Sequence, residues 1–185
     1  MLSRDDYVFF WKINEVHGWG SQWYYSPFKA KIRFEEGKEQ EEVEFLTAEH
    51  WMMVQKSLLF KDAAVAQEIL SIKEVNQSSM TEVKGLGRKV SDFNEDKWVK
   101  ARDRIVLEGS LHKFRQNKEL KDNLLATGNK TIVEASPRDR IWGVGFGEKN
   151  ALNQKERWGL NLLGKALEEA RRILREEDAQ AEEHE

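Results

Sequence analysis

The chain has 185 residues, of which 39% are hydrophobic, and a formal net charge of −3 at pH 7. This length suits one domain, and seven Trp and nine Phe supply large apolar side chains for its core. The absence of cysteine excludes disulfides, a thiol nucleophile and cysteine-based metal sites, and the negative charge argues against a general nucleic-acid-binding protein. We expect one folded domain over residues 1–175 and a disordered acidic tail over residues 176–185.

The N-terminal third predicts a small sheet. Residues 7–13 are aromatic and β-branched, which suits a strand. Apolar and charged residues alternate over 27–34, as in a half-buried strand, and a charged turn at Gly37 leads to a returning strand over 43–46. Between the first two strands, the glycine- and aromatic-rich stretch 15–26 predicts a loop, which is either a lid on the core or a stacking wall for a planar ligand.

The stretch TAEHWMMVQKSLLF, residues 47–60, predicts a helix whose first turn is capped by the Thr47 hydroxyl. Glu49 and Lys56 are two helical turns apart, so they share one face, with Met53 between them. This carboxylate and amine form either a semi-buried ion pair or half of an active site. The apolar positions of the same helix are Trp51, Met52, Val54, Leu58 and Leu59.

Helical patterns dominate the rest of the chain. Apolar spacing and capping residues predict helices over 62–70, 80–90, 94–114, 118–126 and 153–177, and a strand over 131–135. We expect Gly85 and Gly87 to break the second of these helices, and the stretch 136–148 to form a loop of the kind that carries function. The predicted fold class is mainly α, of the α+β type, with about six to seven helices and a small antiparallel sheet from the N-terminal third.

Few side chains suit catalysis. The four histidines have no metal-ligand spacing, and no GxSxG motif is present, so we expect no metal, no cofactor and no serine nucleophile. Glu49 could transfer protons and Lys56 could act as a nucleophilic amine if burial shifts their pKa values. Asp139 could be a second carboxylate, and Trp98 and Trp142 could stack on a base or sugar. Each has a purely structural alternative: ion pairing, a solvated amine, a turn cap or core packing.

The opening residues MLSRDDYVFF carry acidic side chains before a short apolar run, unlike a secretory signal. No apolar run approaches the roughly 20 residues that span a bilayer. We therefore expect a protein of the cytoplasm, or of the cytoplasm and nucleus in a eukaryote, without membrane contact.

Six separated motifs resemble those of NADAR (YbiA-like) domains, in the same order and over roughly residues 7–172. They are SQWYYSPF, TAEHWMMVQK, GLGRKV, DKWVKARDRIVLEGSLHKF, LLATGNKTIVEASPRDRIWGVG and WGLNLLGKALEEAR. The most specific are the EH pair followed by Lys56 and the EASPxDxxWG block that ends at Gly143. The chain departs from the family at residues 22–25, where Asn-Phe-Tyr-Pro is common, and in its more charged hairpin turn.

The resemblance implies a compact, mainly helical fold and N-glycosidase chemistry on a ribosyl–nitrogen bond. It implies one of two substrate classes. The first is ADP-ribose attached to guanine bases, including ADP-ribosylated nucleic acid that the protein contacts through the modified base. The second is the phosphorylated pyrimidine intermediates of riboflavin synthesis. The sequence also leaves open a non-catalytic ADP-ribose-binding module and a purely structural protein. The implied catalytic residues are Glu49, Lys56 and Asp139, with Lys56 as a Schiff-base nucleophile or an ion-pair partner of Glu49. The predicted substrate-binding residues are Gln22, Trp23, Tyr24, Arg88, Trp98, Arg102, Trp142 and Gly143, with Arg138 as a further candidate for phosphate.

Overall fold

The computed structural model describes residues 3–184, which form two compact units. One unit is Tyr25–Asn117, and the other comprises the described residues up to Tyr24 and from Lys118 onwards. Each unit is considered by itself. Among residues 3–184, no helix is both long enough and apolar enough to cross a membrane.

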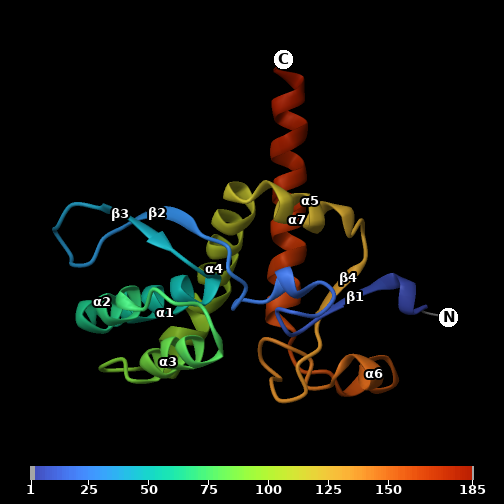
Figure 1. Cartoon of the computed structure of the whole chain (residues 1–185), viewed down its shortest axis with the longest axis horizontal. Helices are drawn as coiled ribbons and strands as arrows, with labels where there is room; N and C mark the ends of the chain where they lie inside the picture. Colours follow the sequence, from blue (N-terminus) through green and yellow to red (C-terminus); the bar gives the residue numbers. More distant parts are fainter. Residues whose placement is uncertain (1–2, 185) are drawn as a thin grey trace. The chain divides into compact units, whose positions relative to one another are not determined.

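The unit Tyr25–Asn117 combines an antiparallel hairpin with four helices (Figure 1). Its elements are β2 (Phe28–Ile32), β3 (Glu41–Phe45), α1 (Ala48–Leu59), α2 (Ala63–Ser71), α3 (Gln77–Arg88) and α4 (Glu95–Gln116). Phe28 pairs with Phe45 at one end of the hairpin. These bounds confirm the predicted hairpin and place each predicted helix of this region.

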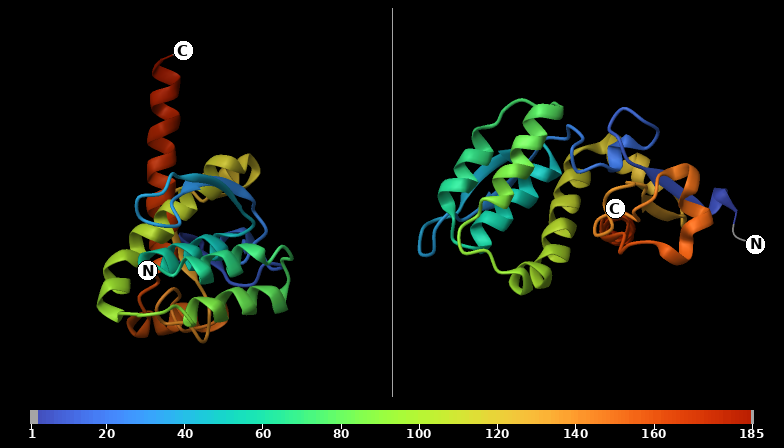
Figure 2. Two further views of the ribbon diagram at one scale, coloured as in Figure 1. Left: turned by 90° about the vertical axis from the view of Figure 1, so that its left-hand side faces the viewer. Right: turned by 90° about the horizontal axis from the view of Figure 1, so that it is seen from below.

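Helix α1 is the centre of this unit and packs against α2, α3 and α4. Both views of Figure 2 show α1, α2 and α3 side by side. The Trp51 ring lies in an aromatic cluster, 5.1 Å from the Phe45 ring and 5.0 Å from the His112 ring. Its indole N–H donates to the carbonyl of Ile105 on α4 at 2.9 Å, so the buried tryptophan leaves no unpaired donor.

Helix α3 corrects the expectation that Gly85 and Gly87 break it, because it continues from Gln77 to Arg88. Its buried Met80, Val83 and Leu86 hold it against its neighbours, and tertiary packing overrides the low helix propensity of glycine. Gly87 serves close approach instead, because a Cβ added there would overlap the Met53 side chain of α1.

The second unit holds a parallel strand pair that the sequence did not reveal. Its elements are β1 (Tyr7–Phe10), α5 (Lys118–Ala126), β4 (Thr131–Glu134), α6 (Glu148–Ala151) and α7 (Leu162–Glu183), together with short 3-10 turns. β1 pairs with β4 in parallel, Tyr7 opposite Thr131, and α7 packs against β4. The predicted first strand was too long, since β1 ends at Phe10.

The final helix differs from the predicted 153–177. Residues Leu152–Arg157 form a 3-10 turn, and α7 begins only at Leu162 and continues to Glu183. The interruption has a cause at Asn161, which adopts a left-handed backbone conformation (φ 52°). Its buried amide donates to the carbonyl of Ile132 and accepts from the N–H of Glu134, at 2.9 and 3.0 Å. Asn161 thus fixes the start of α7 to β4.

Candidate active site

The first turn of α1 is anchored by a buried threonine and histidine. The Thr47 hydroxyl accepts from the His50 backbone N–H at 3.2 Å, as predicted for a cap. The His50 ring reaches the carbonyl of Ile72 through Nε2 at 3.0 Å and the Thr47 hydroxyl through Nδ1 at 2.8 Å. Because a carbonyl only accepts, Nε2 carries the proton and Nδ1 accepts from Thr47. His50, in the EH pair, therefore holds α1 in place.

The Lys56 side chain is half-buried in an aromatic setting. Its amine lies 4.7 Å from the centre of the Phe93 ring and 5.3 Å from that of Trp98. Burial is the main influence on this amine and lowers its pKa, and the positive charge of Arg88 acts in the same direction. The negative charges of Glu95 and Glu49 oppose the shift. A lowered pKa increases the neutral fraction of the amine, which is the nucleophilic form.

We refer to these residues as the Lys56 cluster: Glu49, Lys56, Arg88, Phe93, Glu95 and Trp98. Glu49 is only 4% exposed and shares the Lys56 face of α1. Trp98 is also buried, whereas the Phe93 side chain is 43% exposed. The structure therefore brings together four of the predicted site residues and adds Phe93 and Glu95, which sequence reasoning missed.

A local signal could have identified Phe93. Asn94 caps α4 by accepting from the Lys97 backbone N–H at 2.9 Å. Phe93 precedes this cap and Trp98 is the fourth helical residue, which are the two positions of a hydrophobic staple. The predicted Arg102 lies one turn after Trp98 on α4 and is half-buried.

Asp139 belongs to the other unit, in residues 135–147, which we call the Asp139 loop. One carboxylate oxygen, Oδ1, accepts from the backbone N–H groups of Ile141 and Trp142, both at 2.9 Å. Asp139 thus caps a turn, the structural alternative that its loop position suggested. In the described structure these two bonds use Oδ1 only, so Oδ2 has no protein donor.

The Asp139 loop is held mainly by backbone bonds to the start of α7. The carbonyls of Trp142 and Gly143 accept from the N–H groups of Leu163 and Asn161, both at 3.1 Å. The N–H of Val144 donates to the carbonyl of Glu134 at 3.0 Å. Gly143 is buried where a Cβ would lie 2.7 Å from that same carbonyl, so packing permits only glycine. The predicted Trp142 is half-buried.

The remaining predicted residues lie in two further places. Gln22, Trp23 and Tyr24 are half-buried in a turn, where the N–H of Trp23 donates to the Ser21 hydroxyl at 3.2 Å. Arg138 is exposed in the Asp139 loop. Within residues 3–184, no three His, Asp or Glu side chains gather in positions suited to a metal ion.

A second buried amine, Lys113 on α4, is separate from the Lys56 cluster. It is 1% exposed, its Nζ lies 5.2 Å from the centre of the Phe114 ring, and burial lowers its pKa to about 7. It follows Trp98 by fifteen residues, so the rise of about 1.5 Å per helical residue puts it roughly 22 Å along the helix. Lys113 therefore does not belong to the Lys56 cluster.

Comparisons with known proteins agree over almost the whole chain. Residues 9–175 match the NADAR domain model. An N-glycosidase of Acanthamoeba polyphaga mimivirus is 42% identical, and the alignment covers 97% of this chain and 100% of the relative. An N-glycosidase of Nostoc punctiforme is 29% identical, covering 91% of this chain and 92% of its own length.

A structural comparison extends this likeness to the fold. The NMR structure of the Escherichia coli protein YbiA superimposes with a TM-score of 0.70 at 26% sequence identity. The match covers 96% of this chain and 90% of that chain. Over the shorter stretch that sequence comparison aligns, N-glycosidase YbiA of Escherichia coli is 30% identical, covering 69% of each chain.

Proposed function

The chain belongs to the NADAR domain family and is a hydrolase of N-glycosyl bonds, and we propose that it removes ADP-ribose from guanine bases. The observation that carries this proposal is the half-buried amine of Lys56, with its lowered pKa, beside the rings of Phe93 and Trp98. An amine of this kind is suited to attack a sugar carbon, and an exposed aromatic ring is suited to stack on a base.

The reaction begins with the neutral amine of Lys56. Its nitrogen attacks C1′ of the ribose, and the C1′–N bond to guanine breaks as guanine takes up a proton. Opening of the sugar then breaks the C1′–O4′ bond, gives O4′ a proton and leaves a Schiff base between C1′ and Lys56. Water adds to this Schiff base and releases free ADP-ribose and the amine. The net reaction consumes one water and yields guanine and ADP-ribose.

Glu49 is the proposed proton carrier. It is 4% exposed and is close enough to Lys56 for its charge to raise the pKa of that amine. Protonated, it can donate to the leaving base; ionised, it can activate water, as a carboxyl group does in other glycoside hydrolysis. Glu95 also favours the charged amine, so it helps to set which protonation state Lys56 holds.

The diphosphate of ADP-ribose needs cationic partners, and two arginines support its binding. Arg88 lies near enough to Lys56 to influence its pKa, and Arg102 lies one turn after Trp98. A guanidinium offers a planar fork of donors that fits phosphate oxygens. For the Asp139 loop we propose that Oδ2 of Asp139 binds ribose hydroxyls and that Trp142 packs on the substrate.

The direct test replaces Lys56 by Ala and by Arg and measures ADP-ribose release from a guanine-ADP-ribosylated oligonucleotide. Both variants should lower kcat/KM by at least about 10³-fold, because neither can form the Schiff base. Borohydride treatment of the wild-type protein with substrate should leave a stable sugar mass on the peptide containing Lys56. Lys84→Ala, which removes an exposed lysine of α3, is the matched control and should retain full activity.

Three results would contradict parts of the proposal. Full activity of Lys56→Ala would remove the amine from the mechanism, and active wild-type protein without a trapped adduct would remove the covalent step. A wild-type protein that hydrolyses a phosphorylated pyrimidine intermediate of riboflavin synthesis, but not the modified guanine, would overturn the proposed substrate. Glu49→Gln should reduce turnover by about 10²- to 10⁴-fold if Glu49 transfers protons.

A further inference from the structure

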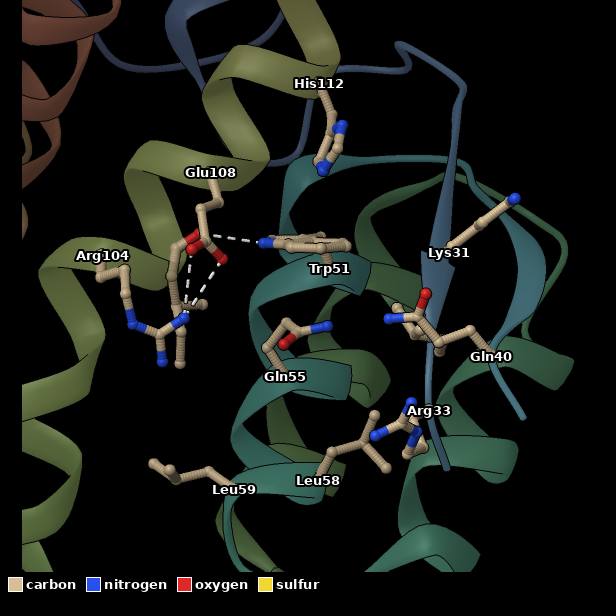
Figure 3. A pocket seen from close by; sticks show the side chains of 12 residues that line it. Lys31, Arg33, Gln40, Trp51, Gln55, Leu58, Leu59, Arg104, Glu108 and His112 are labelled. Atoms are coloured by element: carbon tan, nitrogen blue, oxygen red, sulfur yellow. Dashed lines mark hydrogen bonds and ion pairs between the residues drawn. The ribbon is translucent and has the colours of Figure 1, made fainter. Parts of the chain in front are cut away.

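A groove of about 410 Å³ lies among β2, α1 and α4 within one unit (Figure 3). We call it the β2–α4 groove. Its polar lining residues are Lys31, Arg33, Gln40, Gln55, Arg104, Glu108 and His112. Leu58 and Leu59 of α1 add an apolar part to the wall. The volume falls within the range of small-molecule sites, roughly 300–1,000 Å³.

This groove is distinct from the Lys56 cluster because it uses the opposite side of α1. Gln55, Leu58 and Leu59 line the groove. In a helix with about 3.6 residues per turn, Gln55 and Leu58 point away from the face shared by Glu49 and Lys56, whereas Leu59, three residues after Lys56, borders that face. None of the side chains assigned to the proposed reaction lines the groove.

The polar side chains of the β2–α4 groove are mostly unused by the protein. Within residues 3–184, Lys31 and Arg33 form no ion pair, and the amides of Gln40 and Gln55 have no hydrogen-bond partner. Arg104 pairs with Glu108 at 3.2 Å, and both of these side chains are exposed. The lining therefore has three cations against one carboxylate, although the whole chain has a net charge of −3.

Figure 3 shows how the lining surrounds the groove. Lys31 and Arg33 come from β2 and the residue after its end, whereas Arg104 and Glu108 come from α4. Two residues along a strand span roughly 7 Å, so the charges of Lys31 and Arg33 are separate. In Figure 3 the Lys31 amine points away from Trp51 and Gln55 of α1. Gln55 lies between the two walls, on α1.

We propose that the β2–α4 groove binds the phosphate group of a nucleotide, at a site separate from the Lys56 cluster. Unpaired cations on one wall attract phosphate, and the Arg33 guanidinium can give two parallel hydrogen bonds to its oxygens. The amides of Gln40 and Gln55 offer donors and acceptors for a base or sugar, and the leucines pack on its apolar faces. The ligand is either a free nucleotide or one residue of a nucleic-acid strand, since both present this chemistry. The site goes beyond the proposed reaction.

Calorimetric titration of the full chain at low ionic strength tests this site, with adenosine 5′-monophosphate, adenosine and a short oligothymidylate as probes. The Lys31→Gln/Arg33→Gln double variant should bind the phosphorylated probes about tenfold or more weakly, because two charge-assisted contacts are lost. The control is Lys84→Gln/Lys100→Gln, which removes the same charge from exposed positions of α3 and α4 and should bind as the wild type does.

A second variant avoids any loss of packing. Gln40→Glu places a carboxylate in the groove at an exposed position and should weaken the same binding. If the monophosphate depends on Lys31 and Arg33, the ligand is a free nucleotide; if only the oligothymidylate does, it is a strand. Equal affinities of the groove and control double variants, or no binding of either probe by the wild type, would overturn the proposal. The titrations need no turnover, so they stand apart from the test of Lys56.

Discussion

Side chains from three helices hold the Lys56 cluster together, whereas backbone hydrogen bonds hold the Asp139 loop. Around Lys56, α1 supplies the amine, α3 supplies Arg88, and the start of α4 supplies Trp98 and Glu95. In the loop, Asp139 binds two N–H groups and the carbonyls of Trp142 and Gly143 cap α7. In the cluster on helices, burial of the side chains sets the protonation state of Lys56. In the loop, backbone hydrogen bonds fix the positions of the residues. Substitutions should therefore affect the two regions in different ways.

The largest effect is expected at Trp98, because its buried ring supports Lys56. Trp98→Ala should destabilise the protein by about 3–5 kcal/mol through lost burial and the cavity left behind. Trp98→Phe keeps an aromatic face near the amine and should destabilise the protein less than Trp98→Ala does. Urea unfolding of the two variants and the wild type measures both effects.

The same pair of variants tests the link to chemistry. If the ring sets the environment of Lys56, Trp98→Phe should keep most activity and shift the pH dependence of kcat/KM, which reports the free enzyme. An unchanged pH profile in a folded but weakly active Trp98→Phe would show that the ring acts on substrate alone.

A smaller effect is expected at Asp139, where turn capping and charge can be separated. Asp139→Asn keeps an oxygen acceptor for the N–H groups of Ile141 and Trp142, so its stability should change little. Asp139→Ala removes the acceptor of both hydrogen bonds and should lower the free energy of unfolding by about 1–2 kcal/mol. Thermal unfolding compares the two variants.

Activity then decides what Asp139 does. An active Asp139→Asn with an impaired Asp139→Ala would leave only the turn-capping role. Loss of activity in Asp139→Asn at wild-type stability would instead support a direct role of the charged carboxylate toward substrate. The loop would then resemble the Lys56 cluster in function although it is built differently.

The smallest effect concerns pH and the anchor of α1. Burial lowers the pKa of His50 below its ordinary 6.5, and the positive charge of Lys73 acts in the same direction. The unfolded chain therefore binds this proton more readily, so the free energy of unfolding is greatest above pH 6.5 and falls as the pH drops through the folded pKa. Between about pH 7.5 and about pH 5.5 the loss should be on the order of 1 kcal/mol.

Urea unfolding at both pH values measures this loss. His50→Gln should show a weaker pH dependence than the wild type. His112 also has a pKa lowered by burial, so His112→Asn is the necessary comparison. If the pH dependence is unchanged in His50→Gln and abolished in His112→Asn, it arises from His112 and not from the His50 anchor of α1.

The helices could be predicted from the sequence because their apolar spacing is dense. The bounds of α1 and α5, the Thr47 cap and the β2–β3 hairpin all followed from local patterns. The mainly helical fold class is confirmed, as is the resemblance to NADAR domains. The helix face that groups Glu49 with Lys56 was also readable, since it depends only on the helical period.

Features that depend on partners distant in the sequence were not readable. The parallel pairing of β1 with β4 joins residues more than a hundred positions apart. The late start of α7 depends on hydrogen bonds of Asn161 to β4, and the continuity of α3 depends on its packing, although two glycines argue against it locally. Phe93 lay within a readable local pattern, but its position beside Lys56 required the fold. The roles of the site residues stay predictions.

The close approach of Gly87 to Met53 has a consequence for chemical damage. Oxidation of methionine adds an oxygen to Sδ and makes the side chain polar. Met53 is 6% exposed and leaves no space toward Gly87, so α1 and α3 must separate before that oxygen can be accommodated. The sulfoxide would then hold the two helices apart at Met53, which lies between Glu49 and Lys56 on α1. The contact that sets the spacing of these helices therefore shields Met53 from oxidants while they stay packed.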